Sequence, residues 1–303
     1  MKLMTAVNIK EKTRVRKKHL TESKLGYLLI LPNYLIYITF TLIPIIWTIV
    51  MSFTDYDLRN SHFVGVQNYI AIFRDQTFLR SIWNTIYYSL LTILPTIVLA
   101  LLLALLLNRK IRGRGFFRTL FYLPNILSMV AVSMAWSYLY NAQAGILNRM
   151  LNAVGLPSIG WVTDTRWAMI SVAIMAIWQS LGYNAVLYLS GLQGIPDYLY
   201  EAATIDGANG VQQFFSITIP SLKPTTFFIF VMACIHSFEV FGQVYILTQG
   251  GPMNSTTTIA HQVYLNGFEY YKMGYASAEA VVLLVLIMIM TLINMKGGNT
   301  DVD

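Results

Sequence analysis

Six long apolar runs alternate with polar stretches along the chain, and this alternation predicts its architecture. Each run exceeds the length of about 18 nearly uncharged residues that is typical of a membrane-spanning helix. Four runs contain no charged residue, whereas the fifth contains Glu239 and the sixth contains Glu279. We therefore predict an all-α, polytopic membrane protein with six transmembrane helices, at residues 27–50, 83–107, 119–140, 168–195, 225–247 and 274–295.

The composition agrees with this class and indicates one membrane domain. The chain has 303 residues, of which 56% are hydrophobic and 12% are charged, against about 25% charged residues in a soluble domain. No low-complexity linker divides it, so we expect a domain at 27–296 between a basic tail at 1–26 and a short tail at 297–303. The first run is too long for a signal peptide and lacks a cleavage site after it. The single cysteine, Cys234, excludes a disulfide within the chain and is expected to be buried.

The distribution of positive charge predicts the orientation in the membrane. Lysine and arginine concentrate in the tail before the first run and in the loop at 109–118. Cytoplasmic loops carry an excess of these residues, so both termini are expected to be cytoplasmic. The tail could also be interpreted as a nucleic-acid-binding segment, but it lacks interleaved aromatic residues and topogenic charge explains it.

The loop at 196–224 departs from that trend. It should lie in the cytoplasm, yet it carries the single cation Lys223 against Asp197, Glu201 and Asp206. Its local sequence predicts two short helices. Pro196 suits a helix start, Gly207 suits a left-handed helix end, and Asn209 with Gln212 forms a potential capping box.

The small residues of this loop favour contact with another surface. Ala202 and Ala203 allow close approach to the backbone, and Glu201 and Asp206 flank them. The alternative is a helix pair at the membrane surface without a partner. Two prolines are expected to close the second helix, Pro220 and Pro224.

These residues resemble a known motif. Glu201-Ala-Ala, Asp206-Gly207 and Ile219-Pro220 look like the EAA loop of the permeases of binding-protein-dependent ABC importers. The resemblance extends over residues 26–294, and Glu279 departs from the apolar residue expected at its position. Further matching segments are Ser52-Phe53-Thr54-Asp55-Tyr56, Gly115-Phe-Phe-Arg118, Leu123-Pro124, and two that resemble the sugar branch near the maltose and oligosaccharide permeases, Leu247-Thr248-Gln-Gly250-Gly251-Pro252 and Met273-Gly274-Tyr275-Ala276-Ser277-Ala278.

The resemblance implies a type I ABC importer permease with a maltose-permease-like fold in a bacterial cell membrane. It implies four kinds of partner: a second, paralogous permease, two ATP-binding cassette subunits, an extracellular solute-binding protein and a sugar or oligosaccharide substrate. ATP and Mg would be bound by the ATPase subunits, and this chain would hold no cofactor. The loop would dock on the ATPase through Glu201, Ala202, Ala203, Asp206, Gly207 and Pro220.

Polar residues inside the predicted spans are candidates for a substrate path, because polar groups in a membrane are costly and usually functional. His236, Glu239 and Gln243 follow the i, i+3, i+7 spacing of one helix face, with Ser237 beside them. Aromatic rings with a few polar groups suit sugars, and the fourth span offers Tyr183, Asn184 and Tyr188. In the related importers the fourth and fifth spans line the path. The family's contacts also fall near Ala233 and Val240, which are apolar here.

Other interpretations remain open at this stage. His236 and Glu239 could instead form a packing pair with a partner permease. An ion-driven secondary transporter using Glu239 and Glu279 is a second functional class. The sequence contains neither a G-x-x-x-x-G-K-[ST] phosphate loop nor a His/Cys cluster with metal-ligand spacing. We therefore expect no catalysis and no metal site in this chain.

Overall fold

The computed structural model describes residues 26–27, 29–109 and 112–298, and this part of the chain is helical, without a strand. The basic tail and most of the C-terminal tail lie outside the described residues. The chain divides into two compact units, one ending at Met51 and one beginning at Ser52.

The first unit contains one helical segment of membrane-crossing length, Leu29–Met51, close to the predicted first span. It includes the π-helical turn η1 (Ile38–Leu42) and the helix α2 (Ile43–Met51). Within the described part of this unit no side chain is buried. Its surface consists mainly of exposed aliphatic and aromatic side chains, which suit contact with lipid.

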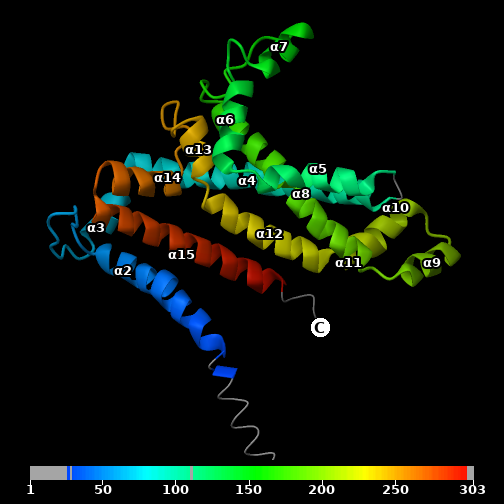
Figure 1. Cartoon of the computed structure of the whole chain (residues 1–303), viewed down its shortest axis with the longest axis horizontal. Coiled ribbons are helices and arrows are strands. Elements are labelled where there is room, and N and C mark those ends of the chain that lie inside the picture. Colours follow the sequence, from blue (N-terminus) through cyan, green and yellow to red (C-terminus); the bar gives the residue numbers. More distant parts are fainter. Residues whose placement is uncertain (1–25, 28, 110–111, 299–303) are drawn as a thin grey trace, which may run out of the picture. The chain divides into compact units, whose positions relative to one another are not determined.

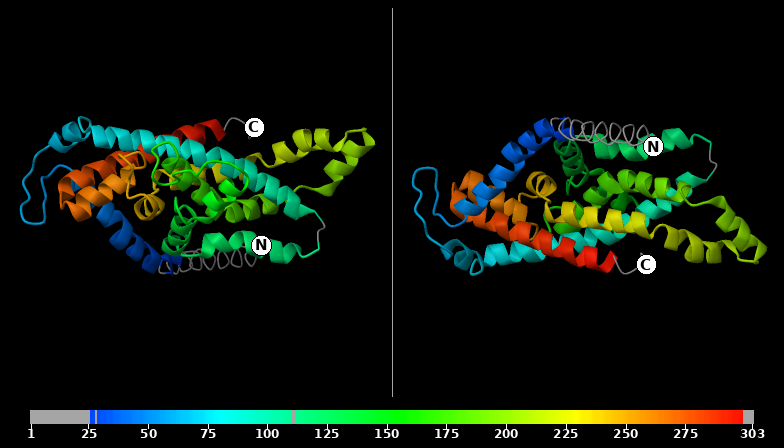
Figure 2. Two further views of the ribbon diagram at one scale, coloured as in Figure 1. Left: turned by 90° about the horizontal axis from the view of Figure 1, so that it is seen from above. Right: turned by 90° about the horizontal axis from the view of Figure 1, so that it is seen from below.

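The second unit is built around two long helices, α4 (Gln76–Asn108) and α8 (Ala168–Gln193), which pack along each other (Figure 1). α5 (Arg114–Ile126) lies along α8, and α12 (Lys223–Phe238) lies along α4. α15 (Met273–Gly298) packs on α12, as the right view of Figure 2 also shows.

Short helices connect these long ones. Figure 1 shows α9 and α10 at the opposite end of the second unit from α3 and α14. The remaining elements are α3 (Gln67–Ile72), α6 (Met129–Leu139), α7 (Ile146–Ala153), α9 (Asp197–Ile205), α10 (Gly210–Gln213), η2 (Phe214–Thr218), α11 (Ile219–Ser221), α13 (Gly242–Leu247), α14 (Ile259–Tyr264) and η3 (Leu265–Glu269).

Small residues allow the long helices to approach closely, as is common between helices in membranes. The core between α4, α8 and α12 includes Ala100, Ala104, Ala185 and Ile229. At Gly182 of α8 the contact is with the backbone of α5, because an added Cβ would overlap the Phe121 carbonyl. This packing fixes α4, α5 and α8 as one frame.

The six predicted spans are present in modified form. Four helices are long and apolar enough to cross a membrane, namely Leu29–Met51, Gln76–Asn108, Ala168–Gln193 and Met273–Asn294. Two bent helix pairs, Arg114–Ile126 with Met129–Leu139 and Gly210–Ser221 with Lys223–Phe238, bring the total among the described residues to six if each pair is counted as one span. The class predicted from the apolar runs is therefore confirmed, and the bends were not anticipated.

The predicted continuous third and fifth helices are wrong. The third span consists of α5 and α6, which meet at an angle of 97°. In the fifth span, α12 ends at Phe238 and α13 begins at Gly242, so residues 239–241 interrupt the predicted helix. The hydroxyl of Thr258 donates to the Val240 carbonyl at 2.8 Å, which provides this interruption with a hydrogen-bond partner outside the helix.

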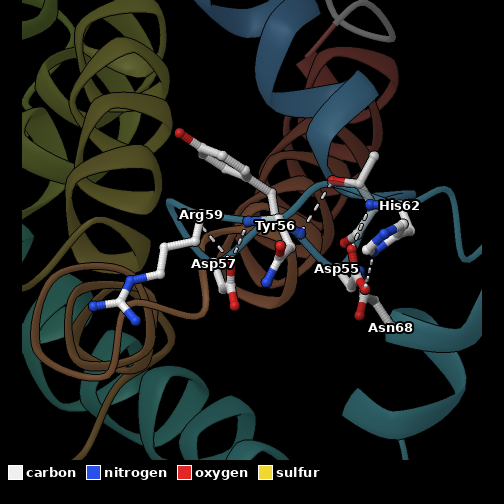
Figure 3. A network of polar contacts seen from close by, with 8 residues as sticks. Asp55, Tyr56, Asp57, Arg59, His62 and Asn68 are labelled. Atoms are coloured by element: carbon white, nitrogen blue, oxygen red, sulfur yellow. Dashed lines mark hydrogen bonds and ion pairs between the residues drawn. The ribbon is translucent and has the colours of Figure 1, made fainter.

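The segment at 52–66 is ordered by its own polar contacts (Figure 3). Asp55 accepts hydrogen bonds from the backbone N–H of His62 at 2.6 Å, and its other oxygen lies 3.2 Å from Nδ1 of the same residue. The hydrogen bond from the His62 backbone lowers the pKa of the Asp55 carboxyl. Asn68 donates to the carbonyls of Ser52 and Thr54 at 2.9 and 2.8 Å, which holds this segment to α3.

Candidate functional site

A cavity of about 780 Å³ lies within the second unit. This volume falls within the range of small-molecule binding sites. Both interrupted spans reach it, together with α4 and α8. Its lining residues include Tyr88, Thr92 and Thr96 from α4, Asn125, Leu127 and Met129 at the bend between α5 and α6, Gln179, Ser180, Tyr183 and Asn184 from α8, and Ala233, His236, Ser237, Glu239, Val240 and Gln243 from α12 and its continuation.

The α4 wall presents the hydroxyl groups of Tyr88, Thr92 and Thr96. Thr92 donates to the Tyr88 carbonyl at 2.9 Å, and Thr96 follows four residues later on the same face. Tyr88 and Thr96 are both buried. The α4 wall therefore offers polar hydroxyl groups but no charged side chain.

The α8 wall combines an aromatic ring with amide groups. Ser180 donates to the Ala176 carbonyl at 2.9 Å, and Asn184 donates to the Ser180 carbonyl at 3.0 Å. The ring of Tyr183 lies with its centroid 6.5 Å from that of Tyr122 on α5. The α8 wall therefore offers an aromatic surface next to an amide whose oxygen can still accept a hydrogen bond.

The interrupted fifth span supplies the most polar wall. His236 and Glu239 are exposed in the isolated chain, and Gln243 is half-buried. Among the described residues, none forms a hydrogen bond or ion pair with the side chains of these three. Ser237 differs, because it is buried and donates to the Cys234 carbonyl at 2.8 Å. The three unpaired side chains are available to a ligand.

A close contact holds the two interruptions together. Gly242 begins α13 directly after residues 239–241, and an added Cβ there would lie 2.5 Å from the Met129 sulfur of α6. Met129 and Gly242 both line the cavity. A larger residue at 242 would therefore displace either the methionine or the start of α13.

The structure brings together six of the seven residues predicted for the substrate path: Tyr183, Asn184, His236, Ser237, Glu239 and Gln243. Tyr188 lies elsewhere. It is fully buried in the core between α4 and α8, and its hydroxyl donates to Thr226 at 3.1 Å. We therefore leave Tyr188 out of the proposed path.

The α4 wall was missed by the sequence analysis. Its signal was nevertheless present, because hydroxyl and phenol residues recur at helical spacing in an otherwise aliphatic run. This stripe is formed by Ser81, Thr85, Tyr88, Ser89, Thr92 and Thr96.

The loop at 196–224 folds into the two predicted helical parts. α9 begins after Pro196 and ends at Ile205, with Asp206 as its C-cap residue, and Gly207 has the left-handed φ of +82° that favours glycine. The predicted capping box is present. The Asn209 backbone N–H donates to the Gln212 side chain at 2.8 Å, and Asn209 Oδ1 accepts from the Gln212 backbone N–H at 3.0 Å. The second helical part ends at Ser221, between the two prolines.

The predicted docking residues lie on an accessible surface. Glu201, Ala202, Asp206, Gly207 and Pro220 are exposed, and Ala203 is half-buried. Large apolar side chains accompany them, which the sequence analysis missed. They are Tyr198, Ile205, Val211 and Phe215, exposed by 65%, 86%, 67% and 64%. Exposed apolar side chains at this density indicate a binding surface.

Both ends of this loop connect directly to the cavity walls. α9 follows α8 after the residues Gly194, Ile195 and Pro196, and α11 is joined through Leu222 to α12. The 210–221 segment meets α12 at 61°. A displacement of the loop would thus act on the two helices that carry Tyr183 and Glu239.

Comparisons with known proteins place this geometry in context. Residues 85–295 match the family model described as the binding-protein-dependent transport system inner membrane component. The probable ABC transporter permease protein YurN of Bacillus subtilis is 37% identical, with 90% of this chain and 96% of that protein covered. The trehalose/maltose transport system permease protein MalF of Thermococcus litoralis is 32% identical, with 91% of this chain and 94% of that protein covered.

A solved structure has the same fold. It belongs to a bacterial ABC transporter involved in the import of the acidic polysaccharide alginate. The TM-score is 0.84 at 26% identity, and 94% of this chain and 99% of the other are covered.

Proposed function

Because the chain belongs to the family of binding-protein-dependent transport system inner membrane components, we propose that it is the permease subunit of an ATP-driven ABC importer for a sugar or oligosaccharide. The cavity carries this proposal. It combines the Tyr183 ring with unpaired polar side chains between two interrupted spans, and sugars need both apolar faces and hydrogen-bonding groups. The sugar-transport relative MalF and the alginate importer support the substrate class.

The remaining components follow from this role. A second, paralogous permease completes the path, and an extracellular solute-binding protein delivers the sugar. Two ATPase subunits bind ATP and Mg and carry out the hydrolysis, so this chain performs no catalysis. The chain lies in the bacterial inner membrane, and the positive charge of the tail and of the 109–118 loop supports cytoplasmic termini.

The 196–224 loop, hereafter the coupling loop, transmits the ATPase motion. Glu201 and the exposed apolar residues around it dock on the ATPase. Since α9 continues from α8 and α11 leads into α12, a movement of the docked loop changes the spacing of the cavity walls. The loop therefore couples hydrolysis in another subunit to access of the sugar.

The ion-driven alternative finds no support. The family and its relatives are ABC permeases, and the two carboxylates it requires lie in separate places. Glu239 lines the cavity, whereas Glu279 is fully buried and accepts from the Asn266 amide at 3.0 and 3.1 Å.

Charge reversal at Glu201 tests the coupling role. Glu201→Arg should reduce co-purification of the ATPase subunits and ATP-driven sugar uptake by about tenfold or more, because a charge-assisted contact becomes a repulsion. Membrane insertion, measured by the amount of chain in the membrane fraction, should be unchanged.

The matched control is Glu269→Arg, which reverses an exposed glutamate in η3, away from the coupling loop. It should retain both assembly and uptake. Normal uptake by Glu201→Arg would contradict the coupling role.

A further inference from the structure

The charge of the cavity lining is unbalanced. Among the described residues that line it, Glu239 is the only one that is formally charged at neutral pH, and no lysine or arginine is present. His236 lies on the same wall as Glu239, and the phenols of Tyr88 and Tyr183 belong to the α4 and α8 walls. The formal charge of the lining is therefore negative.

The position of Glu239 is not explained by helix stability. It is the C-cap residue of α12, where the helix dipole already places a partial negative charge. A carboxylate at a helix C-terminus destabilises the helix, and a cation would be favoured there. Glu239 also has no ion-pair partner among the described residues, so no structural contact compensates for its charge.

The C-terminal end of α12 and the Glu239 carboxylate both make the electrostatic potential in this part of the cavity more negative. The end of α12 and the Glu239 carboxylate both present negative charge next to residues 239–241, where the span is interrupted at the cavity. An anionic group about 6 Å from such a carboxylate would be disfavoured by about 3- to 100-fold, for effective dielectric constants between those of water and of a protein surface. This range is large enough to decide between substrates of similar shape.

We propose that Glu239 makes the cavity a charge filter, so that this permease passes saccharides without carboxylate, sulfate or phosphate groups and rejects anionic ones. The proposal rests on the proposed function and narrows its substrate class to uncharged and amino-bearing sugars. It separates this chain from the structurally similar transporter that imports the acidic polysaccharide alginate.

The filter can be measured without knowing the transported sugar. A single reporter thiol is introduced as Ala233→Cys, which lies in the cavity wall six residues before Glu239. The native thiol is removed by Cys234→Ser. The full chain, purified in detergent with its co-purifying subunits, is treated with a cationic and an anionic methanethiosulfonate reagent of similar size, and the ratio of the two rates is recorded.

Glu239→Gln should lower this cation-to-anion rate ratio by about 5- to 20-fold, since six helical residues span about 9 Å and both reagents feel the lost charge with opposite sign. An unchanged ratio would overturn the proposal. The control Glu269→Gln removes a carboxylate that does not line the cavity, and it should leave the ratio unchanged.

Accessibility of the reporter is checked with a neutral reagent. If Ala233→Cys does not react, Gln243→Cys provides a second reporter on the other side of Glu239. Failure of both to react would show that the cavity is closed to solutes and would also overturn the filter.

Uptake into proteoliposomes that contain the complete transporter separates this proposal from the function on which it rests. Maltotriose and trigalacturonate serve as an uncharged and an acidic probe. Import of trigalacturonate at the rate of maltotriose would overturn the filter. Absence of ATP-driven uptake for every sugar tried would contradict the proposed function, while the reagent ratio would still report the charge of the cavity.

Discussion

Two regions of the second unit treat polar side chains in opposite ways. The first is a buried network between α4, the loop at 249–258 and α14, hereafter the α4–α14 network. The second is the cavity between α4, α8 and the interrupted fifth span. Both contain amide, hydroxyl and imidazole groups, but the network pairs them with one another and the cavity leaves several unpaired.

In the α4–α14 network the protein provides the partners. Asn84 donates to the carbonyls of Asn254 and Thr257, both at 2.9 Å. Thr85 accepts from the Ile259 backbone N–H at 3.2 Å, and Gln262 donates to the Thr257 hydroxyl at 2.8 Å. The contacts of Asn84 and Thr85 join segments that lie 170 to 174 positions apart in the chain.

In the cavity, several polar side chains have no hydrogen-bond partner in the described part of the protein and are available to a bound ligand. His236, Glu239 and Gln243 face an open volume without a protein partner among the described residues. The comparison indicates that burial alone does not identify a functional polar residue in this membrane protein. A polar residue that has hydrogen-bond partners within the protein belongs to the structural framework, whereas one without such partners is a candidate for ligand binding.

The largest effect on stability should come from the network. Asn84→Ala removes two hydrogen bonds and leaves the carbonyl of the buried Thr257 without the Asn84 donor, so it should lower the free energy of unfolding by about 2–4 kcal/mol. Thermal unfolding of the detergent-solubilised protein measures this change. Asn152→Ala, at an exposed asparagine in α7, should change it by about 0.5 kcal/mol or less, and equal effects of the two variants would remove the distinction.

A smaller loss of stability is expected for substitutions of Glu279. Two variants there distinguish the loss of its hydrogen bonds from a change in its side-chain shape. Glu279→Leu leaves the buried Asn266 amide unpaired and should destabilise by about 1–3 kcal/mol. Glu279→Gln keeps an acceptor for that amide in a side chain of the same shape and should retain most of the stability. The two variants are compared in the same unfolding assay, and a greater loss for glutamine would show that the carboxyl group itself is required.

Acidification should lower the stability of the protein through His261 of the α4–α14 network. Burial lowers the pKa of His261, so protons bind first to the unfolded chain, whose histidine has a pKa of about 6.5. Stability is then full above about pH 6.5 and falls as the pH drops towards the lowered pKa of the folded state. The shift in melting temperature between pH 7.5 and 5.5 should shrink in His261→Gln and persist in the exposed control His62→Gln.

The smallest effect on stability should come from the cavity. Gln243→Ala removes a side chain without a protein partner, so the free energy of unfolding should change by about 0.5 kcal/mol or less. Uptake should nevertheless fall by about 5- to 30-fold if one or two hydrogen bonds to the sugar are lost. Unfolding and uptake are measured on the same preparation, and a large loss of stability would assign Gln243 to the scaffold instead.

Much of this arrangement could be predicted from the sequence, because its determinants are local. Charge-free apolar runs predict spans from their length, and the Asn209–Gln212 capping box forms from two residues three positions apart. The common face of His236, Glu239 and Gln243 also survives the interruption of the helix. These features depend on spacing rather than on distant contacts.

The features that escaped prediction depend on tertiary contacts. Residues 239–241 contain neither glycine nor proline, and the hydroxyl that pairs with the Val240 carbonyl comes from Thr258. Tyr188 shares a helix face with Asn184 by spacing, but one turn further along the space is occupied by Thr226 of α12. Which part of a polar helix face borders a cavity is decided by the neighbouring helix.

The interruption after Phe238 also has a consequence for biosynthesis. α12 has 16 residues and is about 24 Å long, which is shorter than a hydrocarbon layer of about 30 Å. Because the carboxylate of Glu239 follows directly, this segment is a poor substrate for independent entry into the bilayer from the translocon. We expect it to enter only once α4 and α8 have already been released into the lipid, so that the helices synthesised earlier form the site into which this shortened helix inserts.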